Sequence, residues 1–220
     1  NLPNRDTRPR RIAITSDDVL WYGDYTRGYL GMYDPKTGKS KEWKSPAGLD
    51  AAPYGITAGA DDAVWYSESG ASPNTLVRFD PKTGLSEVYY VPAPAFGIRG
   101  GDIDKNGVLW GSASSGHLVS FDRRKCKAPL NGAKANGNHC PEGWSSYKYP
   151  GPGFEGLGDN SAESSYYTWV DQHNAVGLGE NVPISTANLG DGFVALKDGK
   201  FVTMRIPYPI SFFAKARSPL

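Results

Sequence analysis

The stretch Ala63-Val64-Trp65-Tyr66-Ser67-Glu68, followed by Thr75-Leu76-Val77-Arg78-Phe79-Asp80-Pro81-Lys82-Thr83-Gly84, decides the fold because it recurs. An earlier copy begins at Val19-Leu20-Trp21-Tyr22-Gly23-Asp24 and ends in the same turn, Asp34-Pro35-Lys36-Thr37-Gly38. A third copy begins at Val108-Leu109-Trp110 and continues with His117-Leu118-Val119-Ser120-Phe121. The three tryptophans are 44 and 45 residues apart, which is the signature of an internal structural repeat.

Each repeat predicts four short strands joined by turns. In the second copy we expect these strands at 54–58, 63–67, 75–79 and 86–91. Four strands in about 40–50 residues are typical of a β-propeller blade. We therefore predict an all-β propeller with blades at roughly 9–46, 53–92, 97–150 and 160–208, and with a further strand or tail at 209–220. An open β-sandwich is the alternative fold for the same strands.

The fourth blade rests on a weaker copy of the repeat. It reads Tyr167-Thr168-Trp169-Val170 and then Phe193-Val194-Ala195-Leu196, which aligns Trp169 with the tryptophans of the other copies. Four blades and a fragment lack a clear closing strand. We therefore expect a partial chain whose propeller is completed by other domains or chains.

Composition excludes several classes of function. The 220 residues contain 24 Lys and Arg against 23 Asp and Glu, so a net charge of +1 argues against nucleic-acid binding. No apolar run approaches the 18 residues of a membrane span, and no charged and apolar leader opens the sequence. There is no Cys-x-x-Cys-His motif for haem attachment.

The two cysteines, Cys126 and Cys140, flank a Gly- and Asn-rich insert. A disulfide across this insert would stabilise the fold by about 3 kcal/mol on the chain-entropy estimate. It would also place the protein in the periplasm or outside the cell. Two free thiols in a cytosolic loop are the alternative, and a metal site with His139 lacks a second ligand pair.

The repeats resemble the virginiamycin B (streptogramin) lyase family of seven-bladed propellers. The matching segments are Pro53-Tyr54-Gly55-Ile56, Val64–Glu68 and Leu76–Gly84, with the first copy repeating them. The resemblance covers residues 9–122 well. It implies a magnesium ion with histidine and glutamate residues at the propeller mouth, and eliminative ring opening of a cyclic depsipeptide.

The chain departs from that family where its blades open. The resemblance implies Pro-His-Gly-Ile, whereas this chain has Pro9-Arg10-Arg11-Ile12, Pro53-Tyr54-Gly55-Ile56 and Gly97-Ile98-Arg99-Gly100. Arginine cannot serve as a general base. His117 and His139 are predicted to be surface residues, so His173 beside Asp171 is the best candidate for a base, with Glu68 as the second catalytic candidate.

Ligand-binding candidates follow from pairing the inner strand of each blade with the second strand. An unbroken hairpin sets Arg10 opposite Asp24, Tyr54 opposite Glu68, and Arg99 opposite Ala113. Arg10, Asp24, Tyr54, Glu68, Arg99 and Asp171 would then line one mouth of the channel, where a small polar or anionic ligand or a protein partner would bind. The alternative is that these pairs only close the ends of hairpins.

Three functions remain open on these residues. The first is a secreted or periplasmic lyase-like propeller that binds a ligand or protein. The second is a magnesium-dependent carbon–oxygen lyase of the streptogramin type. The third is a calcium-dependent lactonase, for which only Asp24, Glu68 and Asp171 offer acidic ligands.

Overall fold

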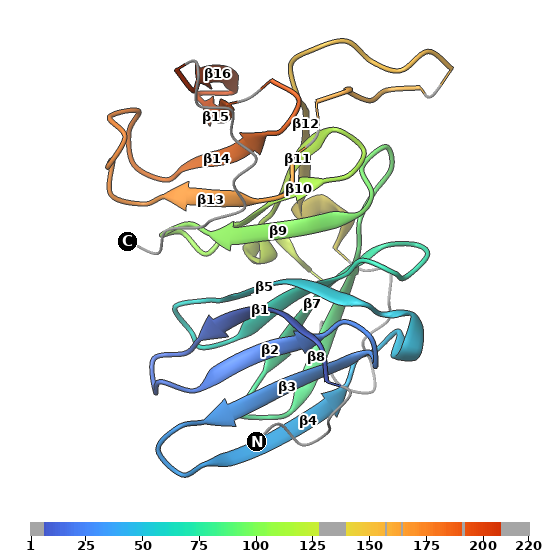
Figure 1. Ribbon diagram of the computed structural model, residues 1–220, viewed down its shortest axis with the longest axis vertical. Helices are drawn as coiled ribbons and strands as arrows, with labels where there is room; N and C mark the ends of the chain where they lie inside the picture. The colour runs from blue at the N-terminus through green and yellow to red at the C-terminus, as the bar shows by residue number, and fades with distance from the viewer. Residues whose placement is uncertain (1–6, 128–139, 157, 164, 191, 208–220) are drawn as a thin grey trace. The chain divides into compact units, whose positions relative to one another are not determined.

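The computed structural model describes residues 7–127, 140–156, 158–163, 165–190 and 192–207. Two compact units make up the chain: Asn1–Val91 with Arg124–Glu142, and Pro92–Arg123 with Gly143–Leu220. Each unit contains two four-stranded antiparallel sheets (Figure 1). Among the described residues, no helix is long and apolar enough to span a membrane. The protein is thus all-β, and its sheets are β-propeller blades.

The first unit contains blades 1 and 2, each a simple meander. Blade 1 consists of β1 (Pro9–Ile14), β2 (Leu20–Asp24), β3 (Tyr29–Asp34) and β4 (Lys39–Lys44), and blade 2 of β5 (Pro53–Ala58), β6 (Val64–Glu68), β7 (Thr75–Asp80) and β8 (Leu85–Tyr90). The four strands expected in the second repeat are confirmed, and every strand end lies within one residue of its predicted position. A short 3₁₀ turn, η1 (Gly48–Asp50), joins the two blades.

The Asp-Pro-Lys-Thr-Gly turns close the β3–β4 and β7–β8 hairpins. Asp34 accepts hydrogen bonds from the Lys36 backbone N–H at 2.8 Å and from the Thr37 hydroxyl at 2.6 Å. The terminal glycine, Gly38, has φ +69°, a conformation that glycine adopts without steric cost. Asp80 and Gly84 repeat the arrangement, which confirms the turn expected from the sequence.

The core of the first unit lies between its two blades. Blade 1 contributes Ala13, Trp21 and Leu30, and blade 2 contributes Ile56 and Phe79 among others. The ring centroids of Trp21 and Phe79 are 5.7 Å apart. Each fully buried side chain of this size contributes about 1.5–3 kcal/mol, so the repeated tryptophan is a packing residue.

The second unit contains blades 3 and 4. Blade 3 consists of β9 (Ile98–Ile103), β10 (Leu109–Ala113), β11 (His117–Phe121) and β12 (Trp144–Lys148), and blade 4 of β13 (Thr168–Asp171), β14 (Val182–Ala187), β15 (Gly192–Lys197) and β16 (Lys200–Arg205). The short 3₁₀ turns η2 (Arg123–Lys125) and η4 (Pro141–Gly143) follow β11 and precede β12. The strand or tail expected at 209–220 lies outside the described residues.

The alignment of Trp169 with the other tryptophans is wrong. Trp169 lies in β13, the first strand of its sheet, whereas Trp21, Trp65 and Trp110 lie in the second strand of theirs. The ten residues between β13 and β14 replace the short inner hairpin of the other blades. The strand that contains Trp169 therefore runs in the direction of a first strand, opposite to the direction of the second strand in which the alignment placed it.

Hydroxyl groups connect blades 3 and 4 inside the second unit. The buried Ser112 hydroxyl lies 2.7 Å from both the Ser165 and Thr168 hydroxyls. Tyr149 donates to Ser185 at 2.8 Å, and burial raises the pKa of the Tyr149 phenol. These mutually satisfied groups fix the two sheets against each other without exposing polar atoms to an apolar core.

Candidate functional site

A β-bulge interrupts the inner strand of blades 1, 2 and 3. The residue paired with Asp24 is Pro9, and the one paired with Glu68 is Pro53, with the register shifting before Ile12 and Ile56. In blade 3, Ala113 pairs with Ile98. An extra residue in the inner strand therefore opposes the second strand, which is the definition of a bulge.

The bulge corrects the predicted pairs by one residue. Arg10 is not opposite Asp24, Tyr54 is not opposite Glu68, and Arg99 is not opposite Ala113. All three residues instead fall within the bulges, just after the paired residue. The third blade opening is accordingly Ile98–Gly101 rather than Gly97–Gly100. Bulges commonly redirect side chains next to functional sites, and Arg10, Tyr54 and Arg99 occupy the bulged positions.

Arg10 and Tyr54 are brought together through a residue that sequence reasoning missed. The guanidinium carbon of Arg10 lies 4.8 Å from the ring centroid of Tyr25. The Tyr25 and Tyr54 rings meet edge to face, with centroids 5.9 Å apart. Arg10 is exposed and both tyrosines are half-buried, so this arginine–tyrosine cluster is accessible on the first unit.

Asp24 lies beside this cluster, but its carboxylate is fully buried. It accepts the backbone N–H groups of Thr26 at 3.2 Å and Arg27 at 3.3 Å, and the Arg27 guanidinium at 2.6 Å. Arg27 also forms an ion pair with Glu42. Burial by itself would lower the pKa of Arg27, but the carboxylates of Asp24 and Glu42 outweigh burial and raise it. The partner of Asp24 is therefore Arg27 in the next turn, not Arg10.

Glu68 is also fully buried, and it joins the two blades of the first unit. One carboxylate oxygen accepts the Ser45 hydroxyl at 2.6 Å and the Ala47 backbone N–H at 2.8 Å, while the other accepts the Thr75 hydroxyl at 2.5 Å. Ser45 and Ala47 belong to the segment that connects β4 to η1. The oxygens of Glu68 thus hold an interblade connection in place.

In the second unit, Arg99 forms a similar cluster. Its guanidinium carbon lies 4.7 Å from the ring centroid of Tyr166, and its Nε donates to the Ser114 hydroxyl at 3.1 Å. The Tyr166 backbone N–H donates to Thr186 at 3.1 Å, which fixes the position of the ring. Tyr166, like Tyr25, carries no repeat signal that would have marked it in the sequence.

Asp171 and His173 lie at the other end of their blade from Tyr166, because β13 runs from Thr168 to Asp171. The Asp171 carboxylate accepts the backbone N–H groups of His173, Ala175 and Val176 at 3.3, 2.9 and 2.9 Å. Burial by itself would raise the pKa of Asp171, but these hydrogen bonds outweigh it and lower the pKa. The imidazole of His173 is exposed.

His117 is not the surface residue that its position predicted. It is buried at 1% exposure, with Nδ1 3.0 Å from the Ser115 hydroxyl. Its Nε2 has no hydrogen-bond partner among the described residues and lies 3.9 Å from the Asp159 carboxylate, which pairs with Lys148. His139 lies outside the described residues.

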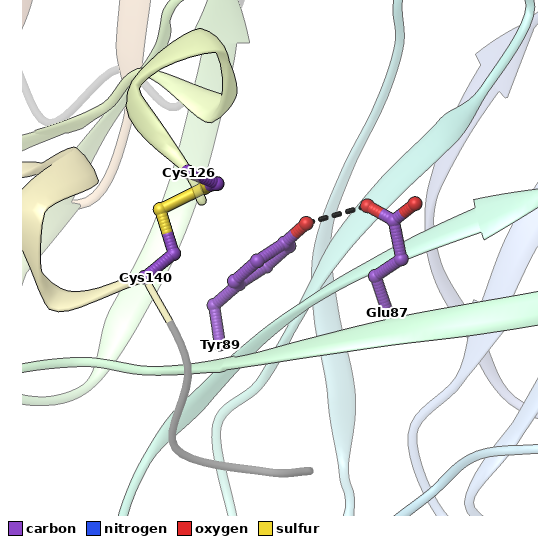
Figure 2. The surroundings of a disulfide bond; sticks show 4 residues. All are labelled: Glu87, Tyr89, Cys126 and Cys140. Carbon is purple, nitrogen blue, oxygen red and sulfur yellow. Dashed lines mark hydrogen bonds between the residues drawn. A yellow bond between two sulfur atoms is a disulfide. The ribbon is translucent and has the colours of Figure 1, made fainter. Parts of the chain in front are cut away.

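The disulfide between Cys126 and Cys140 is confirmed, with Cα atoms 4.9 Å apart. Although this segment lies between β11 and β12 in sequence, it belongs to the first unit. Figure 2 shows the disulfide beside the ring of Tyr89, whose hydroxyl donates to Glu87 at 2.5 Å. The disulfide thus lies next to β8, the last strand of blade 2.

No protein-family model and no curated protein sequence matches the chain. Solved structures do match. Virginiamycin B lyase from Staphylococcus aureus is 19% identical, with a TM-score of 0.71, over 95% of this chain and 59% of the lyase. PorZ, a surface component of the type-IX secretion system of Porphyromonas gingivalis, is 15% identical, with a TM-score of 0.59, over 89% of this chain and 27% of PorZ. The extracellular domain of BT4673 from B. thetaiotaomicron is 14% identical, with a TM-score of 0.57, over 92% of this chain and 23% of that protein.

The chain has a virginiamycin B lyase-like β-propeller fold. It spans less than two thirds of the length of the lyase itself. The disulfide between Cys126 and Cys140 fits a protein of an oxidising compartment.

The residues of this lyase-like propeller do not fit the magnesium ion that the resemblance implies. Magnesium prefers carboxylate and water oxygens in octahedral geometry. The bulge positions carry arginine and tyrosine, and the oxygens of Asp24 and Glu68 already accept hydrogen bonds from neighbouring groups of the first unit. In the part of the chain that the structure describes, no three His, Cys, Asp or Glu side chains are grouped to hold a metal.

Proposed function

We propose that this chain is a secreted or periplasmic binding domain that holds a polar, anionic ligand or protein segment on the arginine–tyrosine cluster of its first unit. The observation that carries this proposal is the stacking of Arg10 on Tyr25, next to Tyr54, at a bulged and exposed strand end. No carboxylate pairs with Arg10 among the described residues.

The chemistry of the cluster favours an anion attached to a ring or an apolar group. A guanidinium stacked on an aromatic face keeps its N–H edge available for a bidentate contact with a carboxylate. The neighbouring ring of Tyr54 offers a flat surface for the rest of the ligand. Uronic-acid sugars and acidic peptide segments both combine these properties.

Catalysis is not part of the proposal. Elimination requires a group that accepts a proton near neutral pH, and a guanidinium cannot do so. The two buried carboxylates, Asp24 and Glu68, are hydrogen-bonded within the first unit, and Asp171 accepts backbone N–H groups. The lyase and lactonase hypotheses therefore need groups other than the six ligand candidates.

Binding can be tested with two acidic probes, trigalacturonate and an acetylated Glu-Tyr-Glu peptide, followed by two-dimensional amide NMR. We expect millimolar or tighter binding, with shifts concentrated at Arg10, Tyr25 and Tyr54. Arg10→Ala should weaken it by about tenfold or more, since a charged hydrogen bond contributes about 1.5–3 kcal/mol. Lys41→Ala is the matched control, because Lys41 also stacks on an aromatic ring, that of Trp43, but on β4.

Two results would contradict the proposal. One is that the acidic probes shift the amide NMR signals of the cluster residues no more than maltotriose, the uncharged control for the sugar, does. The other is that Arg10→Ala and Lys41→Ala bind the probes as well as the unaltered chain does.

A further inference from the structure

Arg8 adds a second cation to the arginine–tyrosine cluster of the first unit. Pro9 pairs with Asp24. One residue earlier, the Tyr25 backbone N–H donates to the Arg8 carbonyl at 3.4 Å, so Arg8 lies opposite Tyr25 just before β1. Residues opposite each other in antiparallel strands point to the same side. Tyr25 therefore has one arginine opposite it and a second one, Arg10, stacked on its ring.

The charges of Arg8 and Arg10 differ in their surroundings from that of Arg27, the third arginine at this strand end. Arg27 forms ion pairs with the carboxylates of Asp24 and Glu42. Arg8 and Arg10 are exposed, and in the part of the chain that the structure describes neither forms an ion pair with a carboxylate. The two carboxylates are thus occupied by Arg27, and the other two guanidiniums keep their N–H groups for a ligand.

The spacing of Arg8 and Arg10 is fixed by the residue between them. A chain spans at most about 3.6 Å per residue, so the Cα atoms of these two residues lie within about 7 Å of each other. Pro9 has a restricted φ, and its pairing with Asp24 anchors the backbone at this point. The two arginine side chains therefore start from the spacing of alternate residues in an extended chain.

We propose that the ligand of the cluster is an extended peptide segment with acidic residues at two alternate positions, one carboxylate binding Arg10 and the other Arg8. This inference rests on the proposed function and narrows its ligand class. Alternate side chains of an extended peptide lie on one side, about 7 Å apart, which matches the two arginines. Each guanidinium offers a planar fork to one carboxylate. Two adjacent acidic residues would point to opposite sides, so only one of them would reach an arginine.

The surroundings of Arg10 favour a peptide over a uronic-acid sugar. A sugar carries hydroxyl groups on every ring, and these lose their water on binding unless polar partners replace it. Beside Arg10 lie the rings of Tyr25 and Tyr54, and the nearby carboxylate of Asp24 is fully buried. An extended peptide requires only the two guanidiniums for its carboxylates and the rings for its apolar groups.

Three acetylated and amidated peptides, Glu-Tyr-Glu, Glu-Tyr-Gln and Glu-Glu-Tyr, test this inference by amide NMR titration. The second lacks one carboxylate, and the third has the composition and charge of the first with a different spacing. We expect Glu-Tyr-Glu to bind about fivefold more tightly than either, the size expected for an exposed charge pair. Arg8→Ala should remove this difference without weakening Glu-Tyr-Gln, Arg10→Ala should weaken all three, and Lys41→Ala should change none.

The outcomes separate this inference from the proposed function. Equal binding of the three peptides, with Arg10→Ala weakening each, would leave a site for a single anion and overturn the inference alone. Glu-Glu-Tyr binding as tightly as Glu-Tyr-Glu would overturn it as well, because net charge and not spacing would then decide. Trigalacturonate binding that depends on Arg8, with no peptide bound, would identify a sugar as the ligand. If Arg10→Ala changed no binding at all, the proposed function itself would fail.

Discussion

Replacing Glu68 distinguishes its structural role from the ligand-binding role that its sequence position suggested. The Glu68→Ala substitution removes a carboxylate that is fully buried and that accepts three hydrogen bonds. The donors are the Ser45 hydroxyl, the Ala47 backbone N–H and the Thr75 hydroxyl. All three come from loops or strands that join or border blades 1 and 2.

The expected loss of stability follows from what each donor can do afterwards. Hydrogen bonds to a charged acceptor contribute about 1.5–3 kcal/mol each. The Ser45 hydroxyl retains the Tyr66 hydroxyl, 3.0 Å away, and the half-buried Ala47 N–H can reach water. Removing a buried charge also recovers part of its desolvation cost. We therefore expect Glu68→Ala to destabilise the protein by about 3 kcal/mol, and Glu68→Gln by about half as much, since one amide oxygen remains.

Urea unfolding monitored by tryptophan fluorescence measures both variants, with the slope of the transition checked for constancy. Glu180→Ala is the control, because its exposed ion pair with Lys105 should contribute less than about 1 kcal/mol. The reasoning is refuted if Glu68→Ala unfolds at the same urea concentration as the unaltered chain. If that variant also lost trigalacturonate binding, Glu68 would be a ligand contact after all.

Three further predictions test other parts of the structure. Replacing Cys126 and Cys140 together by serine should lower the free energy of unfolding by about 3 kcal/mol, measured under oxidising conditions, and reductant should then have no further effect. Asp171→Asn should destabilise the protein at pH 7, and the difference in urea midpoint from the unaltered chain should shrink as the pH falls from 3.8 through the folded-state pKa. The lowered pKa of Asp171 gives a stabilisation that is fully present above the ordinary value of 3.8 and is lost through the lowered value. Gly28→Ala should cost about 2 kcal/mol more than Gly38→Ala in thermal unfolding, because both have positive φ but only at Gly28 would the new Cβ lie 1.9 Å from a carbonyl oxygen.

The repeat could be predicted because corresponding side chains pack in the same way in each blade where the repeat is clear. Trp21 and Trp65 are both buried at the same place in the second strand. Trp169 misled the alignment because a tryptophan in the first strand of a blade also packs against its own sheet. The sequence around it contains no turn that distinguishes the two positions.

The candidate site was harder to predict because its geometry depends on one extra residue. The sequence pairing assumes an unbroken hairpin, which sets Arg10 opposite Asp24, whereas the extra residue in β1 sets Pro9 there. Tyr25 was missed because nothing in its own segment indicates that a guanidinium from β1 will stack on it. The disulfide was predictable because only two cysteines are present.

The bulge also explains how one fold can carry different chemistry at the same position. Pro9 and Pro53 end the pairing with the second strand, and the ladder resumes at Ile12 and Ile56, which belong to the inner strand of a packed blade. The residue just after the proline is outside the ladder, so neither strand pairing nor core packing restricts its side chain. Arginine and tyrosine can therefore occupy this position without disturbing the blade. A fold retained at 19% identity therefore does not determine which side chain occupies the bulge.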